Sequence, residues 1–312
     1  MNAIVEAFAF DQARKGGVNL DSVANGFEKY LQCAAVSLVS LKRKNPDDEV
    51  VFATNITLPD SFAALFANNG VSVWLVPFDD FVYPDSMEWG LAYYKLCVLK
   101  KVSAQGRFDR ILLCDTDVWC QKPLQSLWRE MQGGGVYMID LHADWESENR
   151  QSMIGDACAL LDLPFEKATC WGGEIIAGES SDLAVFSRNL TNTYRKTLEK
   201  GVFSRRGDEF LVFASQVEGP AIYPANAYAQ RIWTGRHFTP CRHEELAILH
   251  LPGEKDHAFE KAYKALEGGG ALPCDRTFLK WCGLTPSRRP FSLSWFFERG
   301  LSKAKAKFAK VG

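Results

Sequence analysis

The stretch RILLCDTDVWC, residues 110–120, places two aspartates at the end of an apolar run. The run Arg110–Cys114 has the length and composition of a buried strand, so Asp115 and Asp117 follow its carboxyl end. In open α/β sheets, ligands bind outside this end of the strands. Side chains two positions apart on an extended chain point the same way, so we expect the two carboxylates to converge there.

Carboxylates that converge repel each other, and both resist ionisation unless a cation lies between them. Oxygen ligands of this kind suit Mg²⁺ or Mn²⁺, which keep open coordination positions for a phosphate group. The alternative is that Asp115, Asp117 or both cap the turn that follows the strand, because Asp often has this role. The pair by itself leaves both interpretations open.

The first half of the chain alternates between strand-like and helix-like segments, which predicts a mainly parallel sheet covered by helices. A chain of 312 residues with 47% hydrophobic and 24% charged residues has ample material for one large α/β domain. The predicted strands are Ala3–Phe10, Glu49–Thr54, Val71–Phe78 and Arg110–Cys114, and the predicted helices are Glu28–Leu41, Ser61–Asn68 and Gly90–Ala104.

The chain after the aspartate pair continues the alternation but contains a polar, acidic stretch. This stretch, HADWESENRQS at 142–152, is typical of a surface loop or of a lid that closes over a bound donor and excludes water. Further strands are predicted over 136–140, 174–178 and 246–251, and further helices over 122–131, 182–200 and 209–217.

Charge and composition exclude several classes of protein. A net charge of -2 and a pI near 6.2 give no general electrostatic footprint for nucleic acid. The sequence has no apolar run of membrane-spanning length, and its first residues lack the pattern of a signal peptide. Nine scattered cysteines fit reduced, buried thiols, so we expect a cytoplasmic protein without a zinc motif.

The C-terminal residues differ in character from the rest. We expect a catalytic domain over 1–270 and a basic, aromatic extension over 271–312. Its last part, RRPFSLSWFFERGLSKAKAKFAKVG at 288–312, mixes lysines with aromatic residues in a way that suits anionic lipid headgroups. A peripheral membrane contact is one interpretation, and a solvated terminus that packs its aromatic residues on the domain is the other.

The residues around the aspartate pair resemble a motif of a known enzyme family. The stretch YYKLCVLKKVSAQGRFDRILLCDTDVWCQKPLQSLW, residues 93–128, resembles the donor-site region of GT-A fold glycosyltransferases, in particular the retaining enzymes related to glycogenin and to lipopolysaccharide galactosyl- and glucosyltransferases. The order of helix, strand, Asp-x-Asp and following Pro-Leu is similar. The resemblance implies a GT-A (Rossmann-like) fold, Mn²⁺ or Mg²⁺, and a nucleotide-sugar donor, with UDP-hexose the expected one.

A later block, ILHLPGEKDHAF at 248–259, resembles the family's late motif. The resemblance implies that His250 is the third metal ligand beside Asp115 and Asp117. It further implies that Gly253 lets the backbone approach the diphosphate and that Lys255 balances its charge. This lysine comes five residues after the histidine, where the family places it six after. Taken alone, His250 is equally typical of a hydrogen-bonded core histidine.

Two more motifs occupy places that the family uses for sugars. CWGGEIIAG at 170–178 stands where the family has an Asn-Ala-Gly strand that lines the donor sugar, and its Trp-Gly-Gly-Glu resembles an acceptor motif of other GT-A enzymes. By that resemblance Trp171 stacks on a sugar and Glu174 contacts an acceptor hydroxyl, whereas a tight turn with Trp171 in the core is the alternative. RRGDEFLVF at 205–213 aligns with the Asp-Gln-Asp helix start, so Asp208 and Glu209 are further catalytic candidates, although acids also favour a helix N-terminus for electrostatic reasons.

Position in the family pattern assigns the remaining donor-binding candidates. Phe10 and Asp11 end the first strand, where these enzymes hold the nucleobase and ribose. Lys95 stands at the basic position of the helix before the aspartates, where the family usually has arginine, whose bidentate fork a lysine lacks. Thr116 and Gly173 complete the expected donor site.

The sequence therefore predicts a metal-dependent hexosyltransferase that acts on a glycan or glycolipid hydroxyl, with retention of configuration implied by the resemblance. Three alternatives stay open. A degenerate GT-A domain would bind nucleotide or glycan without turnover. A phosphatase of the Asp-x-Asp type would use Asp115 as its nucleophile, but its motif normally opens the domain. A sugar-nucleotide synthase would need a glycine-rich basic loop after the first strand.

Overall fold

A single mixed sheet forms the centre of the molecule. The computed structural model describes residues 1–11, 26–85, 87, 89–141, 147–162, 169–204, 206–216, 219–234 and 243–284. Within these residues a seven-stranded sheet has the order β3-β2-β1-β4-β7-β6-β8. Its strands are β1 Asn2–Phe8, β2 Glu49–Thr54, β3 Val71–Leu75, β4 Arg110–Cys114, β6 Val136–Asp140, β7 Trp171–Glu179 and β8 Ile222–Pro224.

The register of the sheet shows where the chain reverses direction. Strands β3, β2, β1 and β4 are mutually parallel, as the alternation of strand and helix predicted. Strand β7 runs antiparallel to both β4 and β6, and β8 pairs parallel with β6. The predicted mixed, mainly parallel α/β sheet with the aspartate pair at a strand end is confirmed.

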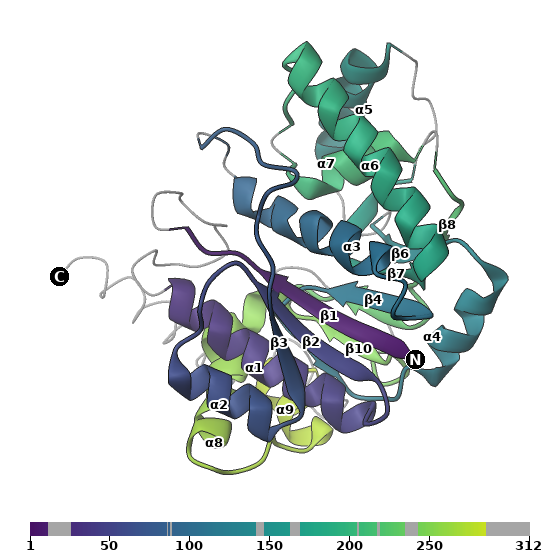
Figure 1. Cartoon of the computed structure of the whole chain (residues 1–312). Helices are drawn as coiled ribbons and strands as arrows, with labels where there is room; N and C mark the ends of the chain where they lie inside the picture. The colour runs from purple at the N-terminus through teal and green to yellow at the C-terminus, as the bar shows by residue number, and fades with distance from the viewer. Residues whose placement is uncertain are drawn as a thin grey trace.

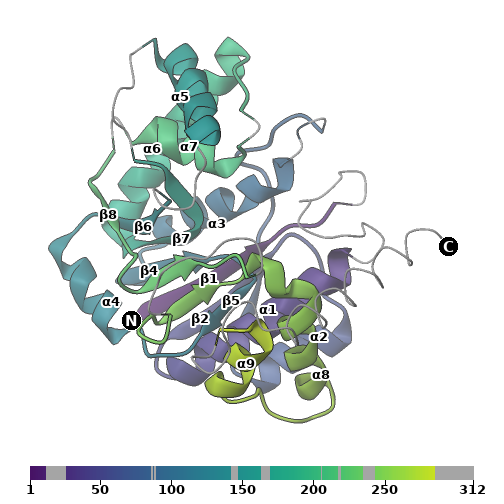
Figure 2. The same ribbon diagram turned by 180° about the vertical axis from the view of Figure 1, so that it is seen from behind.

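Helices cover both faces of this sheet (Figures 1 and 2). On one face lie α1 and α2, with α8 and α9 beside them, and on the other face lie α3 and α6 (Figure 1). These helices span α1 Gly26–Lys44, α2 Asp60–Asn68, α3 Tyr94–Ala104, α6 Ser180–Lys200, α8 Glu260–Glu267 and α9 Asp275–Cys282. A 3₁₀ turn over Gly90–Tyr93 leads into α3. The remaining helices are α4 Gln125–Glu130, α5 Ser147–Leu161 and α7 Asp208–Ser215.

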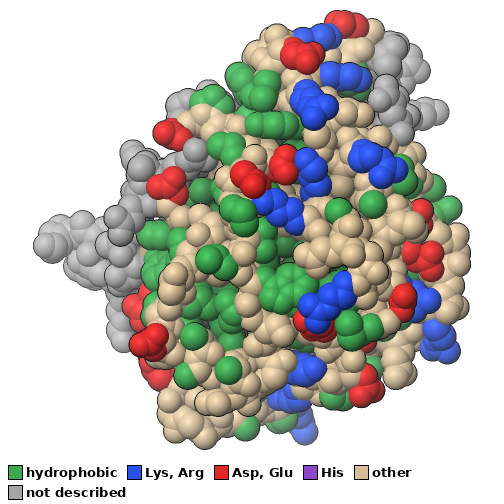
Figure 3. Space-filling view, viewed as in Figure 1, with side chains coloured by type: hydrophobic (Ala, Val, Ile, Leu, Met, Phe, Trp, Pro, Cys, Tyr) green, Lys and Arg blue, Asp and Glu red, His purple; other side chains and the backbone are tan. Residues whose placement is uncertain are grey.

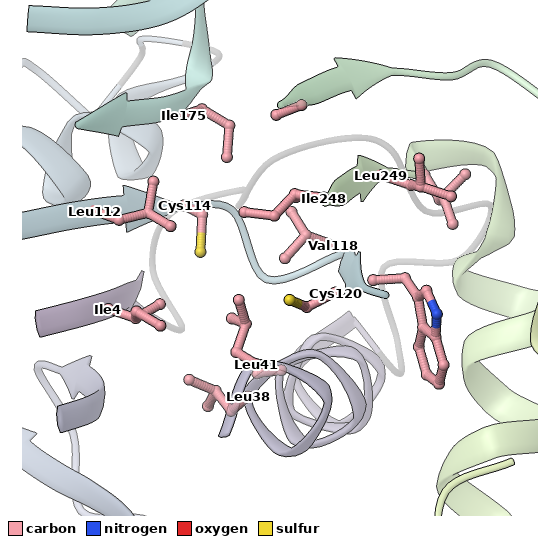
Figure 4. Packing of buried hydrophobic residues seen from close by; sticks show 14 of the residues in the cluster. Ile4, Leu38, Leu41, Leu112, Cys114, Val118, Cys120, Ile175, Ile248 and Leu249 are labelled. Atoms are coloured by element: carbon pink, nitrogen blue, oxygen red, sulfur yellow. The ribbon is translucent and has the colours of Figure 1, made fainter. Parts of the chain in front are cut away.

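A second, three-stranded sheet joins distant parts of the chain. Its order is β5-β10-β9, with β5 Val118–Cys120, β9 Ala229–Arg231 and β10 Ile248–His250. In the register, His250 pairs with Val118 on one side and with Arg231 on the other. Figure 4 shows Val118 and Ile248 of this sheet in the same core as Leu38 and Leu41 of α1. The small sheet thus holds β5, β9 and β10 together beside the end of β4.

Helix α9 belongs to this core as well. The ring of Phe278 stacks on Trp119 of β5 with centroids 3.8 Å apart and planes 8° apart, and both side chains are fully buried. The described part of the expected extension, up to residue 284, therefore packs on the sheet, while 288–312 lies outside the described residues. The domain boundary near residue 270 stays a prediction.

The acidic stretch at 142–152 differs from the expected loop in its second part. Residues 142–146 lie outside the described residues, but α5 begins at Ser147 and runs to Leu161. Met153, Ala157 and Leu160 recur at helical spacing, and all three are fully buried. The expectation of a loop was wrong from Ser147 onward, because a polar helix face has the same composition as a surface loop.

Strand β7 also begins earlier than expected. It includes Trp171, Gly172 and Gly173, so the predicted tight turn before residue 174 is absent. Trp171 is buried at 6% exposure within the hydrophobic core on the α3 side of the sheet. The core interpretation of this tryptophan is therefore the one that the structure supports. Two glycines inside a strand need a reason, and the site provides one below.

The surface seen in Figure 3 carries acidic and basic side chains interspersed. Val73 and Leu75 of the edge strand β3 are 41% and 68% exposed. Within the described residues, no helix is long and apolar enough to cross a membrane.

Candidate functional site

The two aspartates of the Asp-x-Asp pair connect the large sheet to the small one. The Asp115 backbone N–H donates to the Glu174 carbonyl of β7 at 3.0 Å. The Asp117 carbonyl accepts from the Leu251 N–H at 3.0 Å, next to β10. Both side chains leave the same strand end, and Asp117 is buried while Asp115 is partly exposed. The sequence-based expectation that they converge at the end of β4 agrees with this placement.

Each aspartate has one oxygen held by a lysine. Lys95 Nζ donates to Asp115 Oδ1 at 2.7 Å, and Lys255 Nζ donates to Asp117 Oδ2. The other two oxygens face His250. Its Nε2 lies 3.2 Å from Asp117 Oδ1 and 3.8 Å from Asp115 Oδ2. One ligand atom from each of Asp115, Asp117 and His250 lies within 4.8 Å of the other two, so these three residues can hold one metal ion.

The charges around this point also fit a divalent cation. Among the described residues, five carboxylates and three cationic side chains form one connected cluster of ion pairs: Asp115, Asp117, Glu174, Asp208 and Glu209 with Lys95, Arg231 and Lys255. With a neutral imidazole the cluster carries a net charge of -2, which a divalent ion would balance. Lys95 and Lys255 supply positive charge beside the two aspartates, whereas the sequence analysis expected this charge to come from the metal ion alone.

Lys95 connects the metal site to the start of α7. Its Nζ lies 3.2 Å from Asp208 Oδ2 and donates to the Gly173 carbonyl at 3.1 Å. Gly207, with φ of +58°, precedes Asp208, and a Cβ there would lie 3.0 Å from the Trp89 Cβ. A Cβ on Gly173 would overlap the Asp208 carboxylate, whose Cγ would be 3.2 Å away. Glycine at both positions therefore lets Asp208 lie against the strand.

The cluster contains one buried arginine that sequence analysis did not select. Arg231 of β9 donates to Glu174 through Nε at 2.9 Å and through Nη2 at 2.6 Å. The same Nη2 donates to Glu209. Glu174 has no exposed side-chain surface and Arg231 has 12%. The fork geometry is the one that guanidinium and carboxylate groups favour. No pattern in the sequence marks Arg231, because its strand has only three residues.

The protonation states follow from these contacts. Burial alone would raise the pKa of Asp117, but the Lys255 ammonium and His250 outweigh it and hold that pKa well below its usual range. Burial opposes ionisation of Glu174 as well, yet Arg231 and His250 keep its pKa far below the ordinary value. Burial lowers the pKa of His250, but Asp117 and Glu174 together raise it to about 9. Without an ion the imidazole is therefore protonated at neutral pH, and a bound cation would displace that proton.

The late motif forms two short helical turns beside the aspartates. Gly253 lies in the 3₁₀ turn Pro252–Glu254, and a Cβ there would lie 3.3 Å from Thr234 Oγ1. Lys255 begins a π-helical turn that ends at Phe259. Its ammonium lies 5.7 Å from the centre of the Tyr30 ring, and the residue is 4% exposed. Turns of this type occur often at functional sites, and here the turn aims Lys255 at Asp117.

The remaining predicted residues lie at the same edge of the sheet. Phe10 follows the end of β1, where its N–H donates to Asn55 Oδ1 at 2.9 Å and its carbonyl accepts from Asn55 Nδ2 at 3.1 Å. Its ring lies 4.6 Å from that of Phe27. Asp11 is the last described residue before the gap at 12–25, and Thr116 is buried between the two aspartates.

Comparisons with known proteins agree with this architecture. An active-site mutant of LgtC aligns with a TM-score of 0.53 and 16% identity over 90% of this chain and 99% of that chain. The galactosyltransferase LgtC in complex with donor and acceptor sugar analogues aligns at 0.52 and 16%, over 88% and 98%. Mouse xyloside xylosyltransferase 1 in its apo form aligns at 0.50 and 10%, over 80% and 97%. No family model matches the chain, and no curated protein matches its sequence.

These neighbours show the fold. The chain has the GT-A architecture of nucleotide-sugar glycosyltransferases over nearly its whole described length, and the resemblance drawn from the motifs is confirmed at that level. At 10–16% identity the likeness assigns neither donor nor acceptor to this chain.

Proposed function

We propose that this protein is a metal-dependent glycosyltransferase that moves a hexose from a nucleotide sugar, with a UDP-hexose as the donor, to a hydroxyl of a glycan or glycolipid. The observation that carries the proposal is the convergence of Asp115 Oδ2, Asp117 Oδ1 and His250 Nε2 at the end of β4, with the other aspartate oxygens held by lysines. The GT-A fold and the placement of this site support it.

The chain's own residues have distinct roles in this proposal. Asp115, Asp117 and His250 would hold Mn²⁺ or Mg²⁺, which supplies Lewis-acid charge neutralisation for the departing nucleoside diphosphate. Lys255, whose ammonium contacts Asp117, would donate to the diphosphate, and Gly253 in the adjacent 3₁₀ turn would let the backbone approach it. Phe10 and Asp11 would bind the nucleoside, with Thr116 beside the diphosphate.

On the sugar side, Lys95 is central because it contacts Asp115, Asp208 and the Gly173 carbonyl. We assign Asp208 and Glu209 to the donor sugar and the attacking hydroxyl. Burial raises the pKa of Asp208, opposed by Lys95, and raises the pKa of Glu209, opposed by Arg231. Glu174 is different, because its carboxylate is fully buried and both oxygens accept from Arg231, so we do not assign it an acceptor contact.

Three further parts of the proposal rest on the sequence. Retention of configuration follows from the resemblance to the retaining enzymes. The basic, aromatic residues 288–312 would bring the enzyme to anionic lipid, which suits a glycolipid acceptor, and the catalytic domain would then occupy a cytoplasmic membrane surface.

Release of nucleoside diphosphate from a panel of UDP-, GDP- and CMP-sugars, with Mn²⁺ or with EDTA, tests the proposal. We expect release from a UDP-hexose that requires Mn²⁺ and that Asp117→Asn abolishes. Lys264→Met, at an exposed pair on α8, is the matched surface control and should retain the wild-type rate.

The same assay separates the rival interpretations. Mn²⁺-dependent UDP binding with no turnover on any donor would identify a binding module, and release that continues in EDTA would contradict a metal-dependent enzyme.

A further inference from the structure

We propose that Glu174 is a positioning residue for the metal ligand His250, and that Arg231 holds Glu174 in place for this purpose. The inference rests on the proposed metal site and adds two residues to it. Neither residue faces the open side of the site, because Glu174 has no exposed side-chain surface and Arg231 has 12%.

The His250 ring lies between two carboxylates. Its Nε2 faces Asp117 and Asp115, at 3.2 and 3.8 Å, on the side where the cation would bind. Its Nδ1 is buried and has no hydrogen-bond partner among the described residues, and Glu174 Oε1 lies 3.8 Å from it. Histidine ligands in proteins usually donate the second ring N–H to a carboxylate, a backbone carbonyl or a water, which fixes the tautomer and the ring orientation. Glu174 is the carboxylate that faces Nδ1 here.

Arg231 holds this acid in place. Its Nε and Nη2 occupy both Glu174 oxygens, at 2.9 and 2.6 Å. Two parallel donors from one guanidinium fix the orientation of a carboxylate, so the Arg231 fork keeps Glu174 Oε1 on the side of His250 Nδ1. Arg231 and His250 also stand opposite each other in the register of β9 and β10, so the small sheet sets their separation.

The backbone of β7 makes room for this carboxylate. A Cβ on Gly172 would overlap Glu174 Oε2 and would lie 2.7 Å from its carboxyl carbon. Glycine at 172 therefore lets the Glu174 side chain fold back over its own strand toward β10. This requirement gives a physical reason for the glycine, and it provides a variant that displaces the carboxylate without removing a charge.

The test measures Mn²⁺ affinity by EPR titration of the full chain, and the ¹⁴N modulation of bound Mn²⁺ by pulsed EPR. We expect Glu174→Gln to raise the Mn²⁺ dissociation constant by about 10- to 100-fold, since a neutral amide cannot serve both the Arg231 fork and the imidazole. The imidazole ¹⁴N modulation should decrease in the same variant. Gly172→Ala should change both readouts in the same direction, and it serves as the second variant if Glu174→Gln does not fold.

Glu267→Gln is the matched control, because it makes the same carboxylate-to-amide change at an exposed position at the end of α8, outside the charged cluster. It should bind Mn²⁺ within about threefold of wild type. Wild-type affinity and ¹⁴N modulation in folded Glu174→Gln would overturn the inference while leaving the metal site intact. Absence of Mn²⁺ binding by the wild-type protein, with or without UDP, would instead overturn the proposed function.

Discussion

Replacing Lys255 by methionine removes one cation from the metal site while keeping a side chain of similar length. Lys255 is 4% exposed, and its ammonium contacts Asp117, which is 3% exposed. Among the described residues, the buried Asp117 carboxylate of Lys255→Met would retain only His250 as an ion-pair partner. Removing one partner of a buried ion pair typically costs about 3–5 kcal/mol, because the remaining charge is left uncompensated.

This cost should be visible in thermal unfolding without metal. For 312 residues, each with an unfolding entropy of roughly 2.1 cal/mol/K, a loss of about 3–5 kcal/mol corresponds to a melting temperature lower by roughly 5–8 °C. A Mn²⁺ ion that binds only the folded state would stabilise it by about 2.7 kcal/mol at 100 times the dissociation constant. We therefore expect Mn²⁺ to recover a large part of the loss in Lys255→Met, because the ion replaces the missing positive charge beside Asp117.

The assay is differential scanning fluorimetry in EDTA and in Mn²⁺, with Lys264→Met as the control. Lys264 pairs with Glu260 on the surface and is 67% exposed, so its loss should change the melting temperature by about 1–2 °C at most. An EDTA melting temperature for Lys255→Met equal to that of the control would refute the energetic role of this pair. Failure of Mn²⁺ to stabilise Lys255→Met would show that the ion and the ammonium do not share Asp117.

Other parts of the structure make separate predictions. Glu6 in β1 is fully buried, and burial raises its pKa, so its stabilising contribution is complete below its unfolded pKa and is lost as pH rises toward the folded pKa. Glu6→Gln should therefore raise the unfolding free energy more at pH 8 than at pH 5. The difference is up to about 1.4 kcal/mol per pH unit between the unfolded and the folded pKa of Glu6. An equal effect at both pH values in urea titrations would contradict this. Trp119→Ala should cost about 3–5 kcal/mol because Phe278 loses its stacked ring, and a loss under 1 kcal/mol would show that α9 is not part of the core. Deleting 288–312 should reduce co-sedimentation with phosphatidylserine vesicles and leave UDP affinity unchanged, whereas unchanged co-sedimentation would exclude this segment as the membrane contact.

The sequence was most informative where one local pattern determines one element. The apolar runs Glu49–Thr54 and Arg110–Cys114 form β2 and β4 with the predicted bounds, because buried parallel strands are continuous hydrophobic segments. Asp115, Asp117 and His250 were predicted to meet although 133 residues separate Asp117 from His250. That prediction came from the resemblance of two motifs, since no local property of His250 indicates a ligand.

The parts that the sequence did not predict depend on long-range contacts. Arg231 lies on a strand of three residues, and only pairing with β10 places it behind Glu174. Burial of an arginine is unfavourable by itself, so residue type alone argues against its position. The roles of Lys95 and Lys255 as counter-ions for the aspartates were likewise visible only once the distances were known. A pair of acids in a sequence does not reveal how much of its charge the protein itself balances.

The most direct test of the metal site is anomalous diffraction at the manganese edge from crystals of the full chain grown with Mn²⁺ and UDP. We expect one anomalous peak in bonding contact with Asp115, Asp117 and His250, with the UDP diphosphate bound to the same ion and Lys255 contacting a phosphate oxygen. Bound UDP without a manganese peak at these three side chains, or a peak held by other residues, would contradict this expectation.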